Sequence, residues 1–205
     1  MSSNHPHDPD ARPAASGATS RPVPPAPPVP ACLAHRPTVG GLVVPWVTPR
    51  AADGRFLFGV IDPQRLASCL TGYLCQVCGR RLKRPVVLLM RRRDLTRQCV
   101  SEPACHPVCA AYTTRACPMV AGRMEHYRSA PVRLGEQMTH APDTAARLGQ
   151  PAEVWYAVWL DGYHTIIDPV NGLPAASFAG TRPRRVRRIT PTGESTPDAN
   201  HRQPS

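Results

Sequence analysis

Two pairs of metal-ligating residues constrain this chain more than any other feature of its sequence. Cys75 and Cys78 lie in "CQVCGRRL", and His106 and Cys109 repeat the same two-residue gap in "HPVCAAYTTRACP". Two cysteines in a C-x-x-C turn can reach one ion, and Zn²⁺ takes four sulfur and nitrogen ligands in tetrahedral geometry. The sequence therefore predicts a structural zinc site built from these four residues.

The residues around the pairs predict how each pair is held. Gly79 directly follows the first pair and supplies the positive φ of a tight turn. Pro107 suits the first position of a helix, which places His106 at the N-cap and Cys109 in the first turn. In a treble clef, a knuckle (a tight turn with two ligands) precedes a β-hairpin and then a helix whose start carries the last two ligands. Here the knuckle would be the turn at 75–79, a strand follows at 85–90, and the helix start carries His106 and Cys109. We therefore expect a small treble-clef-like zinc-binding core.

The other cysteines leave alternatives open. Cys99 and Cys105 are close enough in sequence to replace His106 as a ligand. A redox role for the C-x-x-C is disfavoured, because a glycine and basic residues follow it instead of the start of a helix. Free cysteine is often a small buried apolar residue, and we expect this of Cys32, Cys69 and Cys117.

Proline and small polar residues dominate both ends of the chain. They bury little apolar surface, and proline lacks an amide donor, so disordered tails are predicted over 1–30 and 190–205. A single domain is predicted over 31–189. Its fold class is α+β, with antiparallel β-hairpins and short helices around the zinc site.

Local signals give the elements of this domain. Strands are predicted at 38–49 and 54–61, and a helix at 62–73 that begins with Asp62 as its N-cap. The stretch 91–105 is expected to be irregular. The strand at 85–90 is apolar throughout and should be buried.

The second half of the domain carries a hairpin signal. "EVWYAVWL" and "YHTIID" flank Asp161-Gly162, a dipeptide that favours a type I′ turn. Further strands are predicted in "AASFAG" and "RRVRRI", and a loop with a short helix over 129–150.

The formal net charge is +11, and Lys83 is the one lysine among 25 basic residues. Clustered cations attract phosphates, although an arginine-rich composition also produces solvated basic surfaces. A second cluster comprises Arg182, Arg184, Arg185, Arg187 and Arg188. The first cluster is the candidate nucleic-acid interface: Arg80, Arg81, Lys83, Arg84, Arg91, Arg92, Arg93 and Arg97.

The sequence also predicts a compartment. No apolar leader opens the chain, and the apolar stretches are far shorter than the roughly 20 residues that span a bilayer. We expect a cytoplasmic protein without membrane contact, in which thiols stay reduced and bind metal rather than form disulfides. No motif indicates a small-molecule substrate.

The block from Leu74 to Met119, "LCQVCGRRL … SEPACHPVCAAYTTRACPM", resembles a family of uncharacterised actinobacterial proteins with relatives in actinobacteriophages. The likeness extends more loosely from Cys32 through "EVWYAVWL". It implies no activity. It implies the ligand set Cys75, Cys78, His106 and Cys109.

These features favour a non-enzymatic zinc-binding module whose basic surface contacts nucleic acid or a protein. The alternative is a metal-dependent nuclease of the treble-clef, HNH-like class, which needs a histidine base and ligands for a second ion. The central candidates for those roles are His126 and His164, with Glu125 and Asp168.

A third hypothesis is an adaptor that docks through the aromatic residues of the predicted hairpin, since aromatics are favoured interface anchors. A chain with 5% aromatic residues is more simply expected to pack these rings in its core: Trp155, Tyr156, Trp159 and Tyr163.

Overall fold

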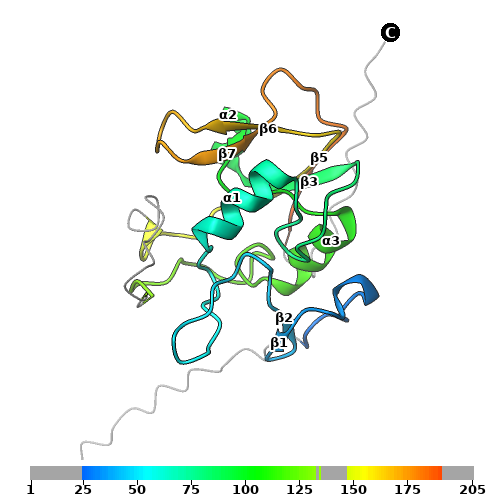
Figure 1. Cartoon of the computed structure of the whole chain (residues 1–205). Helices are drawn as coiled ribbons and strands as arrows, with labels where there is room; N and C mark the ends of the chain where they lie inside the picture. Colours follow the sequence, from blue (N-terminus) through cyan, green and yellow to red (C-terminus); the bar gives the residue numbers. More distant parts are fainter. Residues whose placement is uncertain (1–24, 133, 135–146, 191–205) are drawn as a thin grey trace, which may run out of the picture.

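The computed structural model describes residues 25–132, 134 and 147–190. The predicted tails over 1–30 and 190–205 lie mostly outside these residues, as does much of the segment 129–150. The described chain is a mixed α+β fold with small antiparallel sheets (Figure 1). Its elements in order are η1 (Ala31–Leu33), β1 (Thr38–Val39), β2 (Leu42–Val43), α1 (Pro63–Gly72), β3 (Val86–Arg91), α2 (Arg92–Arg97), β4 (Cys99–Val100), α3 (Pro107–Ala116), β5 (Trp155–Leu160), β6 (His164–Ile167), β7 (Pro174–Ser177) and β8 (Arg185–Arg188).

The main sheet has β5 at its centre, with β3 and β8 antiparallel on either side. The register places Val86 opposite Leu160 and Arg91 opposite Trp155. Every residue of β3 is buried, which confirms the predicted buried strand. Because successive side chains of a strand point to opposite faces, both faces of β3 must be covered.

Two apolar clusters cover those faces. Val87 and Leu89 pack in a cluster that includes three of the predicted ligand cysteines and Trp155. Val86 and Leu88 pack in the other cluster, with Leu70 of α1 and Phe178 beyond β7. The main sheet therefore separates two cores. The metal-side core is the cluster that contains the predicted ligand cysteines, and the second core is the cluster that contains Leu70 and Phe178.

Helix α1 begins and ends as its sequence predicts. The side chain of Asp62 accepts hydrogen bonds from the N–H groups of Gln64 and Arg65, and Pro63 occupies the first turn. The helix stops at Tyr73, which adopts the left-handed conformation with φ 53°. The helix lies next to β7 and contacts it (Figure 1).

The predicted hairpin across Asp161-Gly162 is wrong. Strand β5 is paired on both edges, with β3 and β8, so it has no edge left for β6. The chain instead crosses to a second sheet of order β4-β7-β6, in which β6 pairs antiparallel with β7. The strands predicted in "AASFAG" and "RRVRRI" are confirmed as β7 and β8.

The predicted strand at 54–61 is also wrong. An isolated bridge between Arg50 and Phe56 is the only pairing recorded for it within the described chain. Gly54 and Gly59 adopt φ of 86° and 80°, which interrupt an extended run. The predicted strand at 38–49 is reduced to the two-residue strands β1 and β2.

The stretch expected to be irregular at 91–105 contains the helix α2 and the short strand β4. Asp94 makes the helix start possible, because its carboxylate accepts a hydrogen bond from the N–H of Arg91 at 3.1 Å. Within the described ranges, no helix combines the length and apolarity needed to cross a bilayer.

Candidate metal centre

The C-x-x-C pair lies in a tight turn between α1 and β3. The N–H of Cys75 donates to the carbonyl of Arg80, and the N–H of Gly79 donates to the carbonyl of Cys75, both at 2.8 Å. Gly79 has φ 75°, a conformation that glycine adopts readily. The turn brings the sulfur atoms of Cys75 and Cys78 together, as the sequence predicts.

The N-terminal segment closes this turn from behind. The N–H of Trp46 donates to the carbonyl of Val77 at 2.9 Å, and Nε2 of His35 donates to the carbonyl of Cys78 at 3.0 Å. A Cβ on Gly79 would lie 2.6 Å from Cδ1 of Trp46. Only glycine allows the indole ring to approach the turn this closely.

The start of α3 supplies the other two candidate ligands. His106 is the N-cap and Pro107 occupies the first turn, as predicted. Nδ1 of His106 lies 3.4 Å from Sγ of Cys78. One ligand atom from each of four residues lies within 4.8 Å of the other three, an arrangement that could hold a metal ion: Cys75, Cys78, His106 and Cys109.

A second hydrogen bond orients the imidazole of His106. Its Nε2 lies 3.0 Å from the carbonyl of Arg81. A carbonyl only accepts, so Nε2 donates this hydrogen bond, and Nδ1 faces Sγ of Cys78. Metal-binding histidines typically make such a bond, which fixes both tautomer and ring orientation.

Hydrogen bonds among the thiols set their protonation. The pKa of Cys75 is lowered, because the thiols of Cys105, Cys109 and Cys78 donate hydrogen bonds to its sulfur. The same contacts with Cys75, together with burial, raise the pKa of Cys78, Cys105 and Cys109. Metal ions bind thiolates, so an ion at this group would displace the protons of the ligand thiols.

Cys105 is the residue that the sequence leaves as an alternative to His106. It is fully buried, and a backbone bridge with Val87 holds it next to the knuckle. Its thiol contacts Cys75, but it lies outside the group of four. Cys99 pairs with β7 instead, so His106 is the residue that completes the group.

None of the eight cysteines, all of which the structure describes, forms a disulfide. Burial raises the pKa of Cys69 to about 12, so this side chain behaves as a neutral apolar group. Burial also raises the pKa of Cys117, whose side chain packs with Cys32 against the metal-side core.

The predicted basic cluster is divided by β3. The knuckle cluster precedes the strand and is exposed: Arg80, Arg81, Lys83 and Arg84. The α2 cluster follows it and is also exposed: Arg92, Arg93 and Arg97. The second arginine cluster leads into β8, whose four residues are all exposed.

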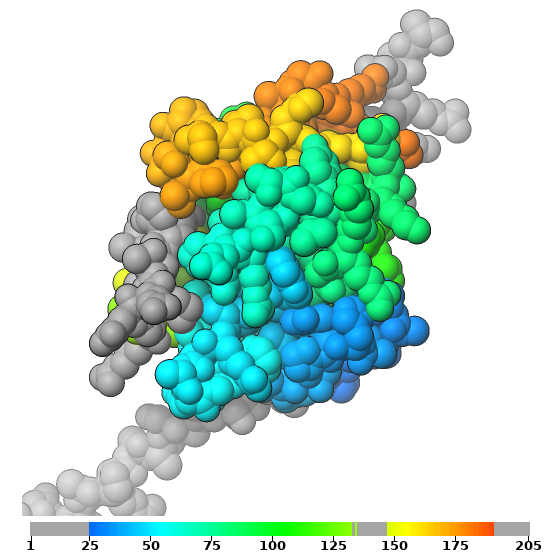
Figure 2. Space-filling model, viewed as in Figure 1, coloured from blue at the N-terminus to red at the C-terminus, as the bar shows by residue number. Residues whose placement is uncertain are grey.

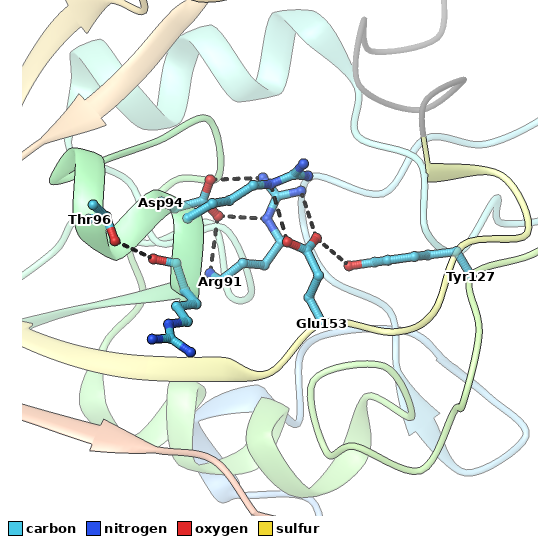
Figure 3. A network of polar contacts seen from close by, with 7 residues as sticks. Arg91, Asp94, Thr96, Tyr127 and Glu153 are labelled. Carbon is cyan, nitrogen blue, oxygen red and sulfur yellow. Dashed lines mark hydrogen bonds and ion pairs between the residues drawn. The ribbon is translucent and has the colours of Figure 1, made fainter.

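Arg91 is a correction to the predicted surface, because only 4% of this residue is exposed. Its Nε lies 2.6 Å from Oδ2 of Asp94, and its Nη1 lies 3.8 Å from Oε2 of Glu153. Tyr127 donates to the same Glu153 oxygen at 3.0 Å (Figure 3). Burial and the nearby Glu153 carboxylate raise the pKa of Tyr127. Arg91 therefore ties β3 to α2 and to the chain before β5.

The residues proposed for a nuclease are not brought together as a second centre. His126 and His164 are both exposed. Asp168 is buried and engaged in an ion pair with Arg97. Among the described residues, the four-ligand group is the only cluster with metal-ligand spacing.

The aromatic residues of the 155–163 segment are largely drawn inward. Trp155 and Tyr163 are 4% and 3% exposed, and Tyr156 and Trp159 are half-buried. The expectation of core packing is confirmed for Trp155 and Tyr163. This leaves little of the surface that an adaptor would use.

Comparison of the chain with family models, curated proteins and solved structures found no match. Trp46, which packs behind the knuckle, carries no local sequence signal that would have revealed its role.

Proposed function

We propose that this chain is a structural zinc-binding module. The observation that carries the proposal is the group of three buried thiols and one half-buried imidazole whose ligand atoms lie within 4.8 Å of one another. A tetrahedral ion with Zn–S bonds of about 2.3 Å separates its sulfurs by about 3.8 Å, so a small contraction would seat the ion. Four protein donors leave no open position for water or substrate, which favours a structural role over a catalytic one.

The order of the elements supports a treble-clef-like arrangement as part of this proposal. The knuckle is followed by β3, the chain returns to β3 through the bridge between Val87 and Cys105, and α3 then begins at the ligand His106. Helix α2 and strand β4 would be an insertion between the two arms. We also propose that the actinobacterial and actinobacteriophage proteins that share the cysteine block share this metal site in the cytoplasm.

Elemental analysis of protein purified without added metal tests the zinc proposal. We expect about one zinc per chain, lost in the Cys75→Ser, Cys78→Ser variant and in His106→Ala. Cys105→Ser is the matched control and should keep its zinc. Absence of metal, with the double variant folding normally, would overturn the proposal. Zinc retained in His106→Ala but lost in Cys105→Ser would reassign the fourth ligand.

The second part of the proposal is that the knuckle cluster contacts nucleic acid. Arg81, Lys83 and Arg84 are exposed next to the metal centre, and none of the described carboxylates forms an ion pair with them. Cations that are not neutralised within the protein are the groups that release counterions from phosphate. Such contacts would be independent of base sequence.

Fluorescence anisotropy with labelled DNA over a range of salt concentrations tests this part. Changing Arg81, Lys83 and Arg84 to glutamine should weaken binding at least about tenfold at low salt and flatten the salt dependence. The matched control removes the same charge elsewhere, at Arg115, Arg187 and Arg188. Equal losses in both variants would indicate a general charge effect and contradict a dedicated surface.

A further inference from the structure

A pocket of about 380 Å³ lies where the chain after α1 meets the turn between β5 and β6. In Figure 2 the teal-to-green surface that includes α1 borders the yellow-to-orange surface of the later strands. The pocket is lined by aromatic and basic side chains together with Leu82, Val86, Asp161, Gly162, His164 and Thr181. The aromatic ones are Tyr73 and Tyr163, and the basic ones are Arg81, Lys83 and Arg84.

The charge of the pocket is positive. Asp161 is its only acidic lining residue, and that carboxylate is engaged by Arg184 at 2.5 Å. Asp161 also attracts the guanidinium of Arg84, so Arg81 and Lys83 are the basic lining residues without a described carboxylate as partner. A ligand for this pocket should carry negative charge.

The aromatic wall is held rigidly. The rings of Tyr73 and Tyr163 stack with their centroids 4.7 Å apart. The Tyr73 hydroxyl donates to the carbonyl of Tyr163, whose own hydroxyl donates to the carbonyl of Cys69. Tyr163 is buried, whereas Tyr73 keeps 38% of its surface exposed. Tyr73 therefore presents a fixed aromatic surface at the pocket.

The backbone of Tyr73 is an outlier for so large a residue. Its φ of 53° is a conformation that glycine and asparagine adopt more easily, and that costs other residues about 1–2 kcal/mol. Strain of this kind concentrates at functional positions. A tyrosine at this helix end is unfavourable for the helix, but it supplies the pocket with its ring.

We propose that this pocket holds one nucleotide of a single-stranded nucleic acid, with the base against Tyr73 and the phosphates against Arg81, Lys83 and Arg84. The proposal rests on the nucleic-acid contact proposed above and specifies its substrate class. Bases in a duplex are stacked on one another, so only an unstacked base can meet the ring. The volume is within the range of small-ligand pockets, roughly 300–1,000 Å³.

The test measures binding of the zinc-loaded full chain to a fluorescein-labelled thymidine 12-mer and to a mixed-sequence duplex of equal length. The wild type should bind the single strand more tightly than the duplex at the same salt concentration. Tyr73→Phe keeps the ring and should keep this preference. Tyr73→Asn removes the ring but suits the left-handed backbone, and should weaken single-strand binding about tenfold while leaving duplex binding unchanged.

The outcomes separate this proposal from the one on which it depends. If single strand and duplex bind equally and Tyr73→Asn changes neither, the pocket assignment is overturned while the basic surface stands. If the wild type binds neither, the nucleic-acid contact itself fails. If free thymidine monophosphate displaces the 12-mer at the same nucleotide concentration, the ligand is a free nucleotide and the assignment to a strand is overturned. Circular dichroism of both variants checks that each is folded.

Discussion

Gly79 determines how closely the chain can pack against the turn that carries Cys75 and Cys78. Its φ of 75° shapes the turn, and its missing side chain admits the ring of Trp46. Gly180 separates these two requirements. It has the same φ of 75°, but a Cβ added there would have no atom within 4 Å.

We predict that Gly79→Ala lowers the free energy of unfolding substantially more than Gly180→Ala. Both substitutions incur the left-handed backbone cost of about 1–2 kcal/mol. Only Gly79→Ala also forces the indole ring away, so its zinc affinity should fall as well. Urea denaturation and competition with a zinc chelator measure the two effects. Equal losses at both positions would show that Trp46 adjusts without cost.

The candidate metal ligands could be predicted from the sequence because the geometry that joins each pair is local. A two-residue gap, a following glycine and a proline after His106 all act within a few residues. The contacts of Trp46, Tyr73 and Arg91 could not be predicted in the same way. Trp46 and Tyr73 contact residues that only the fold brings near them. Arg91 is buried, although its position in a run of basic residues indicates an exposed side chain.

A long-range contact of this kind also joins two elements, α2 and the second sheet. Arg97 is the last residue of α2, and its guanidinium pairs with Asp168, which follows β6. Burial alone would raise the pKa of Asp168, but hydrogen bonds from the N–H of Val170 and from Arg97 hold it below its ordinary value. The ionised carboxylate therefore stabilises the folded state.

This lowered pKa predicts a pH dependence with a definite sign. The stabilisation is present above the unfolded-state pKa of about 3.9 and is lost as the pH falls through the lower folded-state value. Asp168→Asn should reduce the free energy of unfolding by about 2 kcal/mol at pH 7, and the difference from wild type should vanish in acid.

Urea denaturation at several pH values measures this difference in the free energy of unfolding between wild type and Asp168→Asn. The comparison holds even at a pH at which both proteins lose metal, because the loss is common to both. Asp53→Asn is the control, because Asp53 also pairs with an arginine, Arg55, but at the exposed surface. This control should give no measurable change. A difference for Asp168→Asn that stays constant down to pH 3 would contradict the assignment.

Element existence was easier to predict than element pairing. The buried strand β3 follows from its run of apolar residues, helix α1 from its cap Asp62, and helix α3 from Pro107 in its first turn. The Asp161-Gly162 hairpin signal was misleading, because pairing is decided by which edges are free, and β3 and β8 already occupy both edges of β5. Helix α2 escaped prediction because a basic run hides the capping role of Asp94.

For the molecule as a whole, the ligands are part of the core rather than an appendage to it. Cys75, Cys78 and Cys109 belong to the same apolar cluster as Leu33 and Trp155. Residues from the N-terminal turn, the knuckle and the main sheet therefore meet around the site. Removal of a metal ion bound by these residues should therefore destabilise the packing of this whole core.

We predict that removal of zinc by a chelator abolishes the cooperative thermal unfolding of the metal-side core. Tryptophan fluorescence should also shift to longer wavelength, because Trp155 becomes exposed to water. Structural zinc contributes about 10–16 kcal/mol of binding free energy in small domains, so the melting temperature should rise with zinc concentration. Cys99→Ser, at a buried cysteine outside the group, should retain this dependence. Superimposable melts with and without chelator would argue against a structural metal.

The hydrogen bond between His106 and the carbonyl of Arg81 joins two sites through one residue. The backbone carbonyl of Arg81 orients the candidate ligand His106, and the side chain of Arg81 lines the pocket. Coupling free energy is reciprocal. If zinc fixes the position of Arg81 and so tightens binding in the pocket, an occupied pocket must hold zinc more tightly by the same factor, and nucleic acid would protect the protein from demetallation.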